Sequence, residues 1–167
     1  MAQILTLIIA FLATCMDVTT EKISNVAIVI FILVGIIYQM DTHGAVGIWC
    51  YLKGAGIPLL MLFLLFIFRM LGPGDIKLLS VLGGIIGVGP IIKCIIFAFL
   101  FGAVFAVAFI VVCGNWRERL RYFTEYITRL IKTKEITAYY KPGMQMENFH
   151  FSIPIFMSII LYAGGLY

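Results

Sequence analysis

Charged residues are scarce in this sequence: of its 167 residues, 12% are charged and 63% are hydrophobic. A soluble globular domain is nearer ~25% charged. The composition therefore excludes an ordinary soluble domain and indicates a polytopic membrane protein. We expect an all-α fold, a membrane helical bundle of about six transmembrane helices, which fills residues 1–167 as a single membrane-embedded domain.

Metal-binding patterns are also lacking. The two histidines, His43 and His150, are far apart in sequence, and no C-x-x-C motif occurs among the four isolated cysteines Cys15, Cys50, Cys94 and Cys113. This spacing predicts no metal site and no cofactor, and the cysteines read as small buried apolar side chains. We interpret the net charge of +4 as the excess of basic residues that sets the orientation of a membrane protein, and not as a sign of nucleic-acid binding.

Apolar runs predict the six spans. The first run has no basic start and no small-x-small site after it, so we interpret it as a retained span and not as a signal peptide. Lys53 is expected at one membrane interface, with residues 45–52 near that surface. The predicted spans are residues 4–16 (at most to 19), 26–40, 53–71, 76–88, 91–113 and 149–166.

Basic residues predict the orientation. The segments after spans one, three and five hold ten Lys and Arg residues, and the other side holds only Lys53 and Lys93. Under the positive-inside rule, both termini are external, and Asp17 and Asp75 lie at the cytoplasmic side of the inner membrane. The ten are Lys22, Arg69, Lys77, Arg117, Arg119, Arg121, Arg129, Lys132, Lys134 and Lys141.

The polar segment 115–148 carries apolar residues at helical spacing. They make one face of a helix, which predicts an amphipathic helix on the cytoplasmic leaflet, in contact with membrane lipids. We favour anchoring and topology setting over a direct role in substrate binding. The face comprises Trp116, Leu120, Phe123, Ile127 and Leu130.

Asp75 stands between two apolar runs, in the stretch Gly72-Pro73-Gly74-Asp75-Ile76-Lys77-Leu78. A carboxylate near membrane depth is costly, so it is a candidate functional residue. Gly72 and Gly74 lack a Cβ, which would let the backbone of an extended substrate approach Asp75. The alternative is a tight turn between two helices with Asp75 as the N-cap.

Asp17 is the second acid at a cytoplasmic span end. Two nearby carboxyls in a low dielectric cannot both ionise cheaply, so one keeps a proton. Asp17 and Asp75 would then supply one base and one acid, which suffices to activate a water and to protonate a leaving amine. The alternative is that Asp17 pairs with Lys22 and never meets Asp75.

These motifs resemble a known family, the aspartic prepilin peptidases. Residues 72–78 resemble its G-x-G-D-x-K-L motif. Asp17, Ile23 and Asn25 match D-x-x-x-x-x-I-P-N in register, with Ser24 in place of the usual proline. Residues 151–155 resemble the proline-bearing start of the family's last span.

The resemblance implies an aspartic endopeptidase that cleaves the leader from type IV prepilins or prepilin-like proteins at the cytoplasmic face. It implies that Asp17 and Asp75 are catalytic, and that Asn25 is a supporting residue. Lys22 and Lys77 could act on the aspartates or on lipid phosphates, although an interfacial role is favoured. The chain resembles a short peptidase-only member without the methyltransferase domain, of either the tight-adherence or the archaeal preflagellin kind. Its oligomeric state stays open.

Two other classes of protein also stay open at this stage. One is a small proton- or cation-coupled transporter, although no inverted repeat is visible. The other is a non-catalytic subunit of a pilus or secretion assembly, in which the aspartates are only caps. Substitution of either aspartate separates the classes, because a peptidase would lose cleavage and keep its fold.

Overall fold

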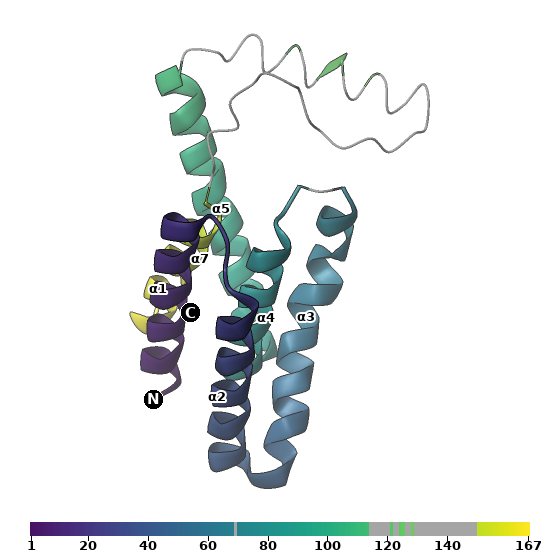
Figure 1. Cartoon of the computed structure of the whole chain (residues 1–167), viewed down its shortest axis with the longest axis vertical. Helices are drawn as coiled ribbons and strands as arrows, with labels where there is room; N and C mark the ends of the chain where they lie inside the picture. The colour runs from purple at the N-terminus through teal and green to yellow at the C-terminus, as the bar shows by residue number, and fades with distance from the viewer. Residues whose placement is uncertain (69, 114–120, 122–123, 126–127, 129–149) are drawn as a thin grey trace.

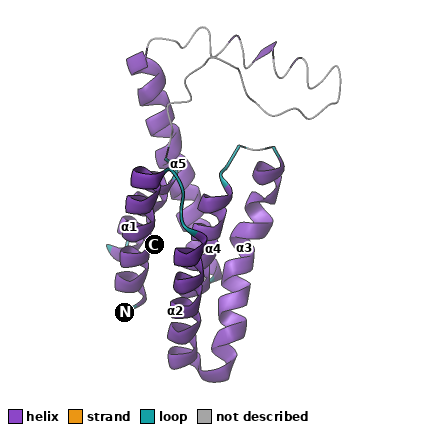
Figure 2. Cartoon of the chain, in the orientation of Figure 1, coloured by secondary structure: helices purple, strands orange, loops and turns teal. Residues whose placement is uncertain are grey.

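The computed structural model describes residues 1–68, 70–113, 121, 124–125, 128 and 150–167, and every element within them is helical. This confirms an all-α helical bundle (Figures 1 and 2). The predicted amphipathic helix over 115–148 lies almost wholly outside the described residues. The elements are α1 (Ala2–Thr20), α2 (Asn25–His43), the 3-10 helix η1 (Gly44–Val46), α3 (Gly47–Ile67), α4 (Pro73–Ile86), α5 (Val88–Cys113) and α7 (Ser152–Ala163).

Three helical stretches of the described chain are long and apolar enough to cross a membrane: Ala2–Thr20, Asn25–Ile67 and Val88–Phe109. The second holds α2, η1 and α3 in succession. The chain is therefore a multi-pass membrane protein. Helices α4 and α7 have 14 and 12 residues. Both are shorter than the ~20 residues that cross a bilayer, so the count of six spans stays a prediction.

Several helices begin or end at other residues than the expected spans do, among them α1 at its end and α3 at its start. Helix α1 continues almost one turn beyond Asp17 and ends at Thr20, and its C-cap Glu21 has a left-handed φ of 56°. In its last turn, the hydroxyl groups of Thr19 and Thr20 donate hydrogen bonds to backbone carbonyl oxygens four residues earlier. Helix α3 begins at Gly47, several residues before the span expected to start at Lys53.

Helix α4 is the centre of the bundle and contacts α1, α2, α3 and α5. It packs most closely on α3, where the Gly83 backbone lies against the Gly54 backbone and a Cβ on either residue would overlap the other. Small residues at helix contacts let backbones approach in this way. Its most buried apolar side chains are Leu78, Leu79, Val81, Leu82 and Ile85.

A tyrosine and a glutamine join α2 and α3 to the middle helix. The ring of Tyr51 occupies the space where a Cβ on Gly84 or Gly35 would be. Gln39 Nε2 donates to the carbonyl oxygens of Gly84 and Ile85 over 2.9 and 3.0 Å. These contacts fix α4 laterally, in the half of the bundle opposite to its N-terminus.

The chain path brings three helix ends to one end of the bundle. Helix α1 ends there, α4 begins there, and α7 begins there, whereas the α2–α3 turn lies at the opposite end (Figure 1). The two motifs singled out in the sequence therefore share one end of the molecule.

Candidate active site

Asp17 lies in the last turns of α1, with 15% of its side chain exposed. The hydroxyl of Ser152, the first residue of α7, donates to Asp17 Oδ2 over 2.6 Å. His150 Nδ1 lies 3.1 Å from the same oxygen. The acid of α1 is thus held by residues that lie more than 130 positions away in sequence.

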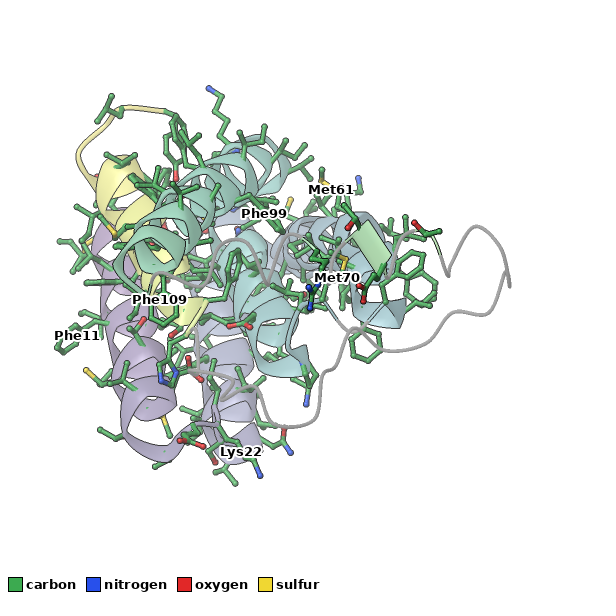
Figure 3. All side chains as sticks on the ribbon, turned by 90° about the horizontal axis from the view of Figure 1, so that it is seen from above. Phe11, Lys22, Met61, Met70, Phe99 and Phe109 are labelled. Carbon is green, nitrogen blue, oxygen red and sulfur yellow. The ribbon has the colours of Figure 1, made fainter. Side chains whose placement is uncertain are left out.

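Packing at the start of α7 fixes these two residues against α1. Thr14 Oγ1 donates to the carbonyl oxygen of Ser152 over 3.2 Å. The Phe151 ring packs against Phe99, with ring centroids 5.2 Å apart, and lies over Gly102, where a Cβ would be 3.0 Å from the ring. The start of α7 is therefore seated on both α1 and α5 (Figure 3).

Asp75 is the third residue of α4. Gly72 is the N-cap, and Pro73 takes the first helical position, where its missing N–H costs nothing. The Asp75 carboxylate accepts from the Gly72 backbone N–H, which is the reach-back half of a capping box. The alternative interpretation was therefore wrong in one detail, because the N-cap is Gly72 and not Asp75.

The two aspartates are electrostatic neighbours. Asp17 and His150 both lie close enough to Asp75 to interact electrostatically with its carboxyl group. Asp17 of α1, Asp75 of α4 and His150, which precedes α7, thus gather at one end of the bundle. Within the described part of the chain, Asp17 forms no ion pair with Lys22, which is exposed at the edge of the bundle (Figure 3).

The other residues singled out in the sequence lie beside Asp75. Lys77 Nζ donates to Asn25 Oδ1 over 2.8 Å, which joins the two motifs directly. Gly72 leaves room for the carboxylate, because a Cβ there would be 3.0 Å from Asp75 Oδ2. Gly74 faces Ile23 of the α1–α2 connection. A Cβ added to Gly74 would lie 3.7 Å from the Ile23 side chain, which is an ordinary van der Waals contact.

Sequence reasoning missed His150 and Ser152. A single histidine at the end of a polar segment carries no signal of its own. The available signal was the position of both residues at the start of the proline-bearing last span, on the side predicted for both aspartates. Among the residues that the structure describes, no group of three or more His, Cys, Asp and Glu side chains could hold a metal ion.

Comparison with known proteins identifies the family of the chain. The model of the type IV leader peptidase family matches residues 4–107, which include both aspartates and both of their motifs. No curated protein and no solved structure matches the chain. Since the match covers more than half of the sequence, the chain belongs to the type IV leader peptidase family, and it is a membrane-embedded peptidase.

Proposed function

We propose that this protein is an aspartic endopeptidase that removes the leader peptide from type IV prepilins or prepilin-like proteins, with Asp17 and Asp75 as its catalytic pair. The single observation that supports this most strongly is the gathering of the two carboxyls at one end of the bundle. The two aspartates are more than 50 positions apart in sequence, and the fold brings both to the helix ends that meet there.

The pair can carry out peptide hydrolysis without another group. One carboxyl, ionised, takes a proton from a water placed between the two. The oxygen of that water then attacks the scissile carbonyl carbon. The other carboxyl, protonated, gives its proton to the leaving amine as the C–N bond breaks. After cleavage the first carboxyl is protonated and the second is ionised. Once the products leave, the proton can return to the second carboxyl, which restores the starting state.

The position of the pair suits a substrate that is half in the membrane. A prepilin-like substrate would keep its apolar helix among the lipids and present its leader at the end of the bundle that holds Asp17 and Asp75. Ten basic residues lie on that side in the predicted topology, which supports a reaction at the cytoplasmic face of the inner membrane. Prepilins and membrane lipids are therefore the proposed partners, and nucleic acid is not.

The family match favours this reading over the transporter and the assembly subunit. The test is co-expression of the chain with prepilin-like proteins of the source organism, with leader removal followed by the shift of the substrate on a gel and by N-terminal sequencing. Accumulation of a shorter substrate that begins after the leader supports the proposal. If no prepilin-like protein is shortened although the peptidase is present in the membrane, the proposal is wrong.

A further inference from the structure

Asp17 is held by α7, and not by its own helix. Its Oδ2 atom receives the Ser152 hydroxyl at 2.6 Å and lies 3.1 Å from His150 Nδ1. An ionised carboxylate has no proton to donate, so His150 has to present an N–H at Nδ1 for this contact to be a hydrogen bond. Both partners then act as donors to the same oxygen.

The second oxygen of Asp17 has a different environment. No hydrogen bond among the described residues involves Asp17 Oδ1, whereas both donors converge on Oδ2. An oxygen without a protein donor can take the proton of a water, and the other oxygen fixes the plane of the carboxyl group. The two contacts therefore set which oxygen is available.

The contacts are shielded from solvent. Ser152 is fully buried, and the His150 and Asp17 side chains are 21% and 15% exposed. Hydrogen bonds to a charged group are shorter and stronger than neutral ones, and low local polarity strengthens them further. Ser152 is itself fixed, because its carbonyl oxygen accepts from Thr14 of α1.

Asp75 is held differently. Its carboxylate accepts from the Gly72 N–H, a group of its own helix N-terminus. Asp17 thus has two side-chain donors distant in sequence, Ser152 at the start of α7 and His150 just before it, and Asp75 has a local backbone donor. Two donors match an acceptor-only, ionised carboxylate, which suits Asp17 to the role of general base and leaves the role of acid to Asp75.

We propose that Ser152 and His150 are positioning residues, which hold Asp17 Oδ2 so that Oδ1 receives the proton of the catalytic water. The inference rests on the proposed function. Both residues lie outside the part of the chain that the family model matches, residues 4–107, so the match does not imply it.

The first test is kinetic. The purified protein in lipid nanodiscs is given a recombinant prepilin that keeps its leader and its apolar helix. Because a hydrogen bond to a charged group is lost, Ser152→Ala and His150→Ala should each lower kcat by about tenfold or more and leave KM within about twofold. His150→Asn can place a side-chain N–H near the position of Nδ1, so it should recover most of the loss.

Matched controls separate positioning from general damage to the fold. Ser158→Ala removes another fully buried serine of α7, whose hydroxyl donates to the Cys94 carbonyl oxygen. His43→Ala removes the other histidine, which is exposed at the opposite end of the bundle. Both controls should keep the kcat of the parent. Wild-type kcat in Ser152→Ala and His150→Ala, or equal losses in the controls, would overturn the inference.

The second test does not depend on cleavage. The chain has two histidines, so nitrogen NMR of the histidine-labelled protein yields the ring signals of two side chains. Asp17→Asn and Ser152→Ala should shift the Nδ1 signal of His150 and leave that of His43 in place. An unchanged His150 signal in Asp17→Asn would show that the contact does not exist.

The two tests also distinguish this inference from the proposed function. If Asp17→Asn still cleaves the prepilin, the proposed function fails. If Asp17→Asn is inactive while Ser152→Ala and His150→Ala are as fast as the parent, the peptidase assignment stands and the positioning role is wrong.

Discussion

Lys77 Nζ donates to Asn25 Oδ1 over 2.8 Å, which ties the second turn of α4 to the first residue of α2. Each residue lies close in sequence to one of the two aspartates. The bond therefore holds the two motifs in register at the end of the bundle where the reaction is proposed.

Replacement of Lys77 should weaken the peptidase without inactivating it. The Lys77–Asn25 bond is exposed, and an exposed hydrogen bond contributes about 1 kcal/mol, so Lys77→Gln should keep cleavage within roughly tenfold of the parent. Lys22→Gln is the matched variant without that bond and should stay within the same range. The measurement is the initial rate of leader removal. A loss at Lys77 as large as that of Asp75→Asn would show a direct catalytic role.

The two glycines of the α4 N-terminus should respond differently to alanine. In Gly72→Ala the new Cβ would lie 3.0 Å from Asp75 Oδ2 and would push the carboxyl away, so cleavage should fall by about tenfold or more. In Gly74→Ala the Cβ would meet Ile23 at 3.7 Å, an ordinary contact, and the rate should change little. An equal, large loss in both variants would instead favour the hypothesis that the substrate backbone approaches Gly74.

The fit of Tyr51 against Gly84 gives a prediction about stability. Gly84→Ala would drive a Cβ into the Tyr51 ring, and overpacking of this kind typically costs ~1–3 kcal/mol, so the yield of folded, detergent-stable protein should fall. Tyr51→Leu removes the overlapping ring atoms and should restore part of the loss in the double variant.

Gly56→Ala is the control for this pair, because nothing lies within 4 Å of the added Cβ. Thermal denaturation in detergent, followed by size-exclusion chromatography, measures the stability of Gly84→Ala, Tyr51→Leu, the double variant of the two and Gly56→Ala. Equal stability of Gly84→Ala and Gly56→Ala would contradict the close contact between α3 and α4.

The orientation of the chain can be tested with reporter fusions. The basic residues predict that a reporter fused at residue 135 reads as cytoplasmic, and that one fused after Tyr167 reads as external. Alkaline phosphatase and green fluorescent protein are active on opposite sides of the membrane and give complementary signals. The reverse pattern would place Asp17 and Asp75 outside and would exclude cytoplasmic leader cleavage.

Much of the fold follows from local sequence. The long apolar runs predicted α1, α2 and α5 to within a few residues. The span that holds α4 was predicted to begin at residue 76, whereas the N-cap is Gly72 and Pro73 is the first helical residue, a position that suits proline. The end of α1 was predicted at Met16, or at most at Thr19, whereas the helix continues through Asp17 to Thr20.

The sequence predicted the two aspartates of the site but not the residues that contact Asp17. Asp17 and Asp75 are rare acids at span ends, so counting charges singles them out. His150 and Ser152 reach Asp17 only through the packing of α7 on α1, over a sequence separation above 130 residues. Such a contact depends on tertiary structure, and neither residue type at that position carries a local signal.

The central claim is that Asp17 and Asp75 act as one catalytic unit. Asparagine has nearly the same volume as aspartate but cannot take or give the catalytic proton, so each Asp→Asn variant should insert and fold normally. Residues that act as a unit are strongly non-additive when they are replaced. The double variant should therefore be no slower than either single one.

The most direct measurement is leader removal from a co-expressed prepilin by Asp17→Asn, Asp75→Asn and the double variant, at matched levels of peptidase in the membrane. We expect no detectable cleavage by any of the three. Substantial cleavage by either single variant would contradict the account, even if an experimental structure showed the two carboxyls side by side.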